Sequence, residues 1–180
     1  FKLQSVPNDN GYSISRTTFK QWDYVECTYD LDCQELWSID DFNYKKKTWS
    51  DGHTAYFIKD ETLFSSTTHG VNTAISTSVV DFTKTKDILV YWKTDNTLVV
   101  QKGSDEPQKY VTDEPVWSSI VVDDQVFIVS KSIKTHKVSI SKVNETITPY
   151  THFIAKSYET IHSLGMLSLN EDQYVLHLEI

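Results

Sequence analysis

Alanine, glycine, proline and long apolar runs are all scarce in this sequence. The 180 residues contain 5 glycines and 4 prolines, and alanine occurs only at positions 55, 74 and 155. No apolar run approaches the roughly 18 residues that a membrane-spanning helix needs, so no membrane span is expected. With so little alanine and no helical periodicity, a long amphipathic helix is hard to place anywhere in the chain.

Signature motifs of the common enzyme classes are also missing. The sequence has no Gly-x-Ser-x-Gly elbow for a serine nucleophile and neither of the glycine-rich patterns that hold phosphate groups. Its six histidines never fall in the spacings typical of metal ligands. We therefore expect no metal site, no cofactor and no enzymatic activity.

Basic residues are too few to balance the acidic ones. The formal net charge is -8 and the sequence pI is about 5.1, and the one dense basic run is Lys45-Lys46-Lys47. An acidic surface repels a nucleic-acid backbone and an anionic membrane. The composition thus argues against a nucleic-acid partner.

Cys27 and Cys33 are the only cysteines, and they lie six positions apart in CTYDLDC. If the flanking residues form the arms of a hairpin, the two side chains meet across the strands within disulfide reach. Two free thiols are the alternative, whereas a metal pair lacks the usual spacing. The disulfide, the single Met and the glycosylation sequon at Asn144 together predict an extracellular or lumenal protein. The first residue is Phe1 rather than Met, as expected of a processed or excised product.

What the sequence does contain is typical of β-strands. Aromatic residues make up 13% of the chain, and valine, isoleucine and threonine are frequent, which favours pleated sheets over helices. Short β-rich runs separated by polar turns predict a series of hairpins. These are Trp22–Cys27 with Cys33–Ile39, Thr54–Lys59 with Thr62–Ser66, Asp87–Lys93 with Thr97–Gln101, Gln125–Ser130 with Lys137–Val143, and Leu164–Leu169 with Gln173–Ile180.

The remaining segments are assigned more simply. Residues 11–19 alternate as a half-buried strand with no partner, and residues 1–10 are expected to be a turn-rich lead-in. Residues 40–53 and 103–114 are expected to be polar loops. Residues 157–163 are compatible with a short helical turn.

The hairpins recur at similar intervals. The central residues of their first arms are Tyr24, Tyr56, Val90, Phe127 and Val175, which lie 32, 34, 37 and 48 positions apart. A period of about 35–45 residues built from short strands is what a β-propeller blade requires. We therefore predict a single all-β domain over residues 1–180, a small propeller-like array of about five antiparallel hairpin units, whole or part of a larger protein. A β-sandwich or jelly roll gives the same local signals and is the alternative, favoured by the scarcity of glycine.

An acidic run offers the only candidates for carboxylate chemistry. Residues 23–41 carry seven carboxylates and no Lys or Arg. Oxygen ligands for Ca²⁺ are present there, but the glycine of a calcium loop is missing. A solvated acidic hairpin is the favoured interpretation, and paired carboxylates of a glycosidase are the alternative.

Aromatic residues in polar segments are the candidates for binding. Trp49 is followed by Ser50 and Asp51 in a polar loop, Trp117 follows Pro115 at the start of a strand, and Tyr150 follows Pro149 in a turn region. Such side chains offer flat amphipathic surface to a sugar ring or a protein partner. Packing over the edge of a sheet is the alternative role for both tryptophans.

These observations predict a non-enzymatic recognition domain that binds a protein partner through loops or strand edges. One alternative is a carbohydrate-binding, lectin-like domain in which Trp49 and Trp117 contact the sugar. Another is a carbohydrate-active enzyme that draws its carboxylates from residues 23–41 or from Asp123 and Asp124. A third is a structural or assembly module that uses its strand edges.

Overall fold

The computed structural model describes residues 2–8, 11–17, 21–40, 48–51, 54–67, 71–132, 134–154, 163–170 and 173–179. These residues form strands and turns and contain no helix. The strands are β1 (Lys2–Asn8), β2 (Gly11–Thr17), β3 (Gln21–Thr28), β4 (Cys33–Asp40), β5 (Thr48–Ser50), β6 (Thr54–Lys59), β7 (Thr62–Thr67), β8 (Asn72–Ser76), β9 (Val79–Lys84), β10 (Ile88–Lys93), β11 (Thr97–Lys102), β12 (Gln108–Val111), β13 (Val116–Val122), β14 (Gln125–Lys131), β15 (Lys137–Val143), β16 (Ile147–Ile154), β17 (Ser163–Asn170) and β18 (Gln173–Glu179).

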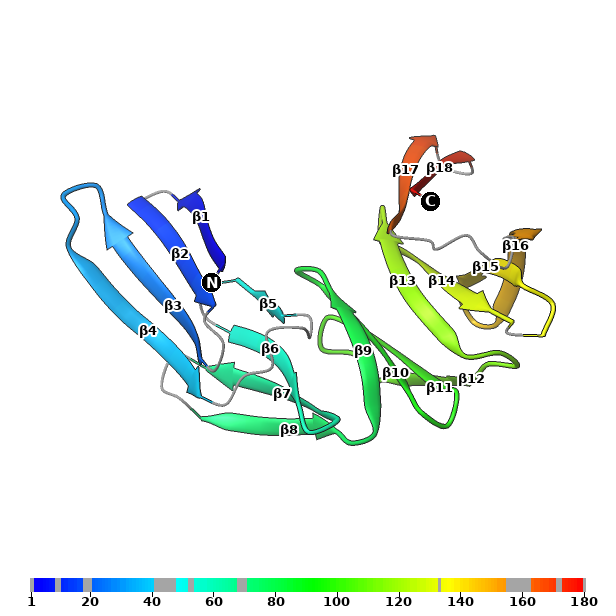
Figure 1. The fold of residues 1–180 in the computed structure, drawn as a ribbon, viewed down its shortest axis with the longest axis horizontal. Helices are drawn as coiled ribbons and strands as arrows, with labels where there is room; N and C mark the ends of the chain where they lie inside the picture. Colours follow the sequence, from blue (N-terminus) through cyan, green and yellow to red (C-terminus); the bar gives the residue numbers. More distant parts are fainter. Residues whose placement is uncertain are drawn as a thin grey trace. The chain divides into compact units, whose positions relative to one another are not determined.

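Every sheet is built from strands that follow one another in the chain. The orders are β1-β2-β3-β4, β5-β6-β7-β8, β12-β11-β10-β9, β13-β14-β15-β16 and β17-β18 (Figure 1). The chain divides into two compact units, Phe1–Val79 and Val80–Ile180. The array of antiparallel hairpin units is thus the predicted one, while the assignment of all 180 residues to one domain stays a prediction.

Acidic residues form the tight turns where glycine is usual. In the two-residue turns that join β6 to β7 and β13 to β14, Asp60, Glu61, Asp123 and Asp124 all have positive φ, between 46° and 59°. Two successive residues with positive φ give a type I′ turn, whose twist matches that of the flanking strands. The scarcity of glycine therefore does not argue against hairpins here.

The core of the second unit lies on both faces of the sheet β13–β16. Val126 and Ile128 of β14 belong to a cluster that contains residues of β10 and β11, such as Trp92 and Leu98. The alternate residues Phe127 and Val129 belong to another cluster, which includes Met166 of β17. Successive side chains of a strand point to opposite faces, so this sheet is covered on both sides. Sheets stacked face to face in chain order are the arrangement expected of propeller blades.

The first unit has its own core in the sheet β5–β8. Ala55, Phe57, Ile58 and Leu63 are buried, and the rings of Phe57 and Phe64 stack with centroids 5.5 Å apart. In the sheet β1–β4, the Asp23 carboxylate is fully buried and accepts a 2.7 Å hydrogen bond from the Ser38 hydroxyl. A buried carboxylate needs such partners because desolvation otherwise disfavours its charge.

Several expectations about individual strands were wrong. The segment expected to be a lead-in is β1, and β2 pairs with both β1 and β3 rather than lacking a partner. The expected loops contain β5 and β12, and the turn region expected around Tyr150 belongs to β16. The residues aligned to define the repeat do not occupy equivalent strands. Tyr56, Val90 and Phe127 lie in the second strand of their sheets, whereas Tyr24 lies in the third strand of the first sheet. The proposed helical turn lies mostly outside the described residues.

These corrected strands share one physical feature. Each of β1, β5, β12 and β16 is the outermost strand of its sheet. Proline is tolerated there because one side of the strand needs no ladder partner, and Pro7 and Pro149 occupy such positions. Edge strands also carry polar residues, as in QKYV of β12, so they lack the alternation that identifies a half-buried strand.

Candidate functional site

Trp49 and Asp51 lie together in the first unit, but in a strand and its turn rather than a loop. Trp49 belongs to β5, and its ring stands edge to face with Tyr56, with centroids 5.8 Å apart. Asp51 Oδ1 accepts a 2.8 Å hydrogen bond from the Thr54 N–H, while the Asp51 N–H donates to the Thr54 carbonyl over 3.3 Å. Asp51 therefore closes the turn between β5 and β6, a role that short polar side chains often have.

The negative charge of Asp51 in this turn affects the ionisation of Tyr56. Partial burial raises the pKa of the Tyr56 hydroxyl, and the negative charge of Asp51 raises this pKa further. Both effects disfavour the phenolate. The Trp49 ring thus packs on a tyrosine that stays neutral over the physiological range.

Trp117 and Tyr150 are both β-bulge residues of the sheet β13–β16. Val116 pairs with Ser130 and Ser118 with Val129, so Trp117 has no register partner on β14. Likewise Thr151 pairs with Ile140 and Pro149 with Ser141, which leaves Tyr150 as the extra residue of β16. A bulge redirects a side chain and interrupts pairing, and bulges are frequent beside binding sites. These two aromatics lie on the two outer strands of one sheet and are 40% and 42% exposed.

A groove of about 610 Å³ in the second unit contains one of the predicted site residues, Tyr150. Trp117 does not line it, and Trp49 and Asp51 belong to the first unit. One wall comes from β12 and the segment after it, and the floor and other wall come from β14, β15, β16 and the turn between the last two. The lining residues are Tyr110–Glu114, Ile128, Ser130, Lys137, Ser139, Ser141, Glu145–Ile147 and Pro149–His152.

Hydroxyl groups form the floor of the groove. Ser130 of β14 stands in register with Ser139 of β15, and Ile128 with Ser141. Because these positions alternate with buried residues such as Val129 and Ile140, the serines share one face of the sheet. The floor is a polar continuation of the apolar cluster that contains Ile128.

Tyr110 connects the two walls of the groove at one end. Its hydroxyl lies within hydrogen-bonding distance of the Gln108 carboxamide oxygen, at 2.7 Å, and of the Asn144 carbonyl oxygen. Partial burial raises the pKa of this hydroxyl, so it remains a hydrogen-bond donor at neutral pH. The β15–β16 turn is thereby held against β12.

The charges along the groove differ between its ends. Lys137 is the first residue of β15, and His152 stands in register with Ser139 close by. Glu145 lies in the turn at the far end of β15. Among the described residues that line the groove, Lys137 is the one lysine and no arginine occurs, whereas Asp113, Glu114 and Glu145 are acidic.

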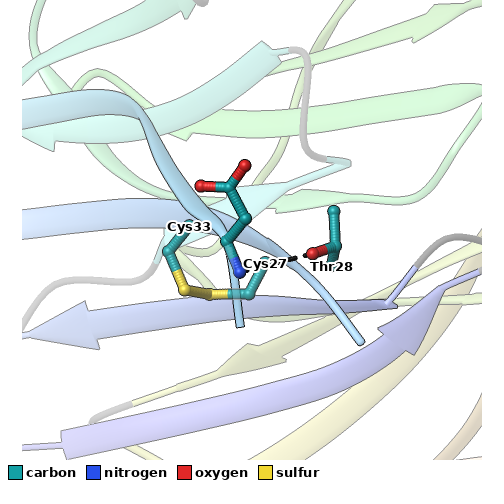
Figure 2. The surroundings of a disulfide bond; sticks show 4 residues. Cys27, Thr28 and Cys33 are labelled. Carbon is teal, nitrogen blue, oxygen red and sulfur yellow. Dashed lines mark hydrogen bonds between the residues drawn. A yellow bond between two sulfur atoms is a disulfide. The ribbon is translucent and has the colours of Figure 1, made fainter. Parts of the chain in front are cut away.

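The two cysteines form a disulfide in the first unit, as predicted. Cys27 and Cys33 stand in register at the end of the β3–β4 hairpin, with their Cα atoms 4.0 Å apart (Figure 2). The Asp32 N–H donates to the Thr28 hydroxyl over 3.3 Å, and the Leu31 N–H donates to the Thr28 carbonyl over 3.0 Å. Closing so short a loop restricts the unfolded chain and stabilises the hairpin by about 2 kcal/mol.

The acidic side chains of residues 23–41 that the structure describes do not gather into one site, and Asp41 lies outside the described residues. Asp30, Asp32 and Glu35 are exposed around this hairpin tip, whereas Asp23 is buried beside Ser38. The described part of the chain contains no group of three or more His, Cys, Asp or Glu residues arranged to hold a metal ion. Asp123 and Asp124 occupy a tight turn. Asn144, the glycosylation candidate, is exposed in the β15–β16 turn.

Most residues of the groove were not predicted as site residues. The serines of β15 alternate with Val138, Ile140 and Lys142, a pattern that identifies a strand face but not what covers it. Only the neighbouring sheet, which brings Tyr110 opposite them, makes that face a groove. In the first unit, a second hollow of about 590 Å³ is lined by Ser38, Phe57, Lys59, Asp60, Thr62, Phe64 and Asn72.

Comparison with known proteins identifies the fold. No protein-family model matches the sequence, and no curated protein matches it. Solved structures do match. The chain aligns with the N-terminal domain of Nup159 at a TM-score of 0.54 and 14% identity, covering 88% of this chain and 47% of that one. It aligns with virginiamycin B lyase from Staphylococcus aureus at 0.52 and 12% identity, covering 89% and 58%.

A third match contains a protein complex. It is the S. cerevisiae structure of Dbp5 bound to Nup159 and Gle1, with a TM-score of 0.56, 14% identity, and coverage of 94% of this chain and 49% of that one. The chain spans about half the length of the structures it matches. Nup159 and virginiamycin B lyase are β-propeller proteins, so the predicted propeller-like fold is confirmed. In the part of the chain that the structure describes, no helix is long and apolar enough to cross a membrane.

Proposed function

We propose that this chain is a non-enzymatic recognition domain that binds a protein partner through the outer strands of its second unit. The observation that carries the proposal is the exposure of apolar side chains on those strands. Val111 of β12, which lines the groove, is 80% exposed, and Ile154 of β16 is 74% exposed. Exposed apolar residues beside a groove are typical of interaction surfaces.

The structural matches agree with this proposal at the level of the fold. Nup159, whose fold this chain resembles, is present in a complex with Dbp5. Its likeness to this chain is confined to the fold, so the partner of this chain must be recognised by its own residues. An enzymatic function has less support, because the predicted acidic residues lie at a hairpin tip, in a tight turn, or buried against a serine.

The test compares binding by two matched surface variants. A partner recovered with the immobilised chain is purified, and its affinity is measured for the unmodified chain, a Val111→Lys/Ile154→Lys variant and a Leu31→Lys control. Leu31 is 78% exposed in the first unit, so the control makes the same kind of change elsewhere. We expect the double variant to lose about tenfold or more in affinity and the control to lose none.

Two results would refute this function. One is a loss of affinity in the Leu31→Lys control with none in the double variant, which would place the contact at the hairpin tip. The other is the absence of any partner that binds saturably. Retention of a glycan rather than a protein would favour the lectin-like alternative.

We also propose that the protein works in an extracellular or lumenal compartment. The disulfide supports this, because such bonds persist in oxidising environments, and Asn144 is exposed as glycosylation requires. Expression through the secretory pathway of a eukaryotic cell should give a product whose mass falls on treatment with peptide N-glycosidase. Asn144→Gln should abolish that change, and an unmodified Asn144 in the secreted chain would count against the glycoprotein assignment.

A further inference from the structure

We infer that the groove binds an extended peptide segment that adds to the edge of β16 and places a basic side chain beside Glu145. This inference rests on the proposed protein-binding function and specifies its partner. It is carried by three features of the described residues: an edge strand, a polar floor and an excess of carboxylates over lysine along the groove. None of the predicted aromatic residues is required for it.

The edge of β16 is suited to strand addition along its second half. Within the described residues, β16 has one strand neighbour, β15, so its other side presents backbone N–H and C=O groups. Proteins protect such edges with proline, bulges or charged side chains. Pro149 and the bulge at Tyr150 protect the first half, but Thr151–Ile154 contains no charged side chain other than the titratable His152 and exposes Ile154.

The floor of the groove suits the alternating side chains of a strand. An added strand directs every second side chain toward the same face. Ser139 and Ser141 of β15, the strand next to β16, lie on that face, and their hydroxyl groups both donate and accept hydrogen bonds. A segment of about eight residues is long enough to pair with Thr151–Ile154 and to continue past Pro149, without ladder hydrogen bonds, toward the turn end of the groove.

The charges of the groove favour a basic residue in the segment. Its lining carries three carboxylates, Asp113, Glu114 and Glu145, against one lysine, Lys137. At the turn end, Glu145 has no cation beside it among the described lining residues. A Lys or Arg of the peptide is therefore expected at the turn end, where Coulomb attraction to the carboxylate is not offset.

A stacking site for sugar rings is less well supported here. The Tyr150 ring stands edge to face with the buried Phe127, with centroids 5.5 Å apart, and the Tyr110 hydroxyl is engaged by Gln108 and Asn144. Neither Trp49 nor Trp117 lines the groove. An extended peptide needs no aromatic platform, because its main chain supplies much of the affinity.

The experiment is a selection of phage-displayed random dodecapeptides on the full 180-residue chain. Enriched sequences are synthesised with a fluorescent label and titrated by anisotropy. The variants are Glu145→Lys at the turn, Ser139→Arg in the floor, and Glu106→Lys as a matched charge reversal outside the groove. Each variant's unfolding curve is recorded, and because Glu145 is exposed, its variant tests the proposal even if Ser139→Arg fails to fold.

We expect enriched peptides that contain Lys or Arg among alternating apolar residues. Glu145→Lys and Ser139→Arg should each weaken binding about tenfold or more, and Glu106→Lys should leave it unchanged. Peptides with N-methyl groups at alternate backbone nitrogens should not bind, because strand addition needs those donors.

The inference is overturned if the selection enriches acidic peptides or none at all. It is also overturned if neither groove variant changes the affinity, or if the N-methylated peptides bind as tightly as the unmodified ones. It is also overturned if a glycan array binds the chain and the groove variants abolish that binding. These failures are distinguishable from failure of the proposed function. A folded partner that still depends on Val111 and Ile154 would preserve protein recognition while excluding a peptide in the groove.

Discussion

At the scale of single residues, Trp117 and Tyr150 are bulge residues within strands. Trp117 was expected at the start of a strand and Tyr150 in a turn region. A bulge is defined by the register of the partner strand, which composition and periodicity do not contain. The disulfide was predictable because its two cysteines lie in one hairpin, where local spacing determines the contact.

Leu31 is a residue whose backbone conformation costs stability. Its φ is 63°, a left-handed conformation that favours glycine, and its side chain is exposed. Leu31→Gly should therefore raise the free energy of unfolding by about 0.5–1 kcal/mol, since relief of the side-chain clash exceeds the added chain entropy. Urea denaturation measures this. The neighbouring Asp30→Gly, at a position without positive φ, should lower stability, and an equal loss in both variants would contradict the account.

Asp51 and Tyr56 allow a test of the electrostatics of the β5–β6 turn. Asp51→Asn keeps an oxygen for the Thr54 N–H but removes the charge that helps raise the pKa of Tyr56. We expect that pKa to fall while staying above its ordinary value, because burial is the larger cause. Nuclear magnetic resonance of ¹³C-labelled tyrosine, assigned with Tyr56→Phe, follows the titration. A pKa that stays fixed or rises would be inconsistent with this assignment.

The raised pKa of Tyr56 also determines how the free energy of unfolding depends on pH. The folded chain holds the Tyr56 proton more tightly than the unfolded chain does. The resulting stabilisation is fully present below the pKa of an unfolded tyrosine and is lost as the pH rises through the folded value. Alkaline destabilisation should accordingly be smaller in Asp51→Asn and smaller still in Tyr56→Phe.

At the scale of strands, the inner strands of the second unit could be predicted, whereas several outer strands could not. The runs that became β10, β11, β14 and β15 contain alternating or continuous apolar residues because neighbours cover their faces. The outer strands β1, β5 and β12 are short, polar or proline-containing, as edge strands usually are. The candidate groove was missed for that reason, since β12 and another outer strand, β16, border it.

Substitutions in β14 test whether the sheet β13–β16 is covered on both faces. Ile128 and Phe127 point to opposite faces and are 3% and 0% exposed. Ile128→Ala should cost about 2–5 kcal/mol and Phe127→Ala about 3–5 kcal/mol in thermal or urea unfolding, because each leaves a cavity in a packed cluster. The half-buried Gln125→Ala at the same strand's start is the control. A negligible cost for either core variant would show that one face is open.

At the scale of the whole molecule, composition constrains the class of partner better than its identity. The net charge of -8 agrees with a partner that offers basic groups, and Glu145 gives a specific place for one. The fold was predictable from recurrent hairpins, and the structural matches confirm it. The proposed binding surface was not, because the groove is formed by residues of separate hairpins that only the packing of adjacent sheets brings together.

Amide hydrogen exchange of the chain with and without its purified partner tests protein recognition by the outer strands most directly. Edge amides exchange readily in the free chain and slow when another chain pairs with them or covers them. We predict added protection over residues 108–114 and 147–154 and none over the hairpin tip at 28–33. Protection confined to that tip or to residues 48–59, with the outer strands of the second unit unchanged, would contradict the account.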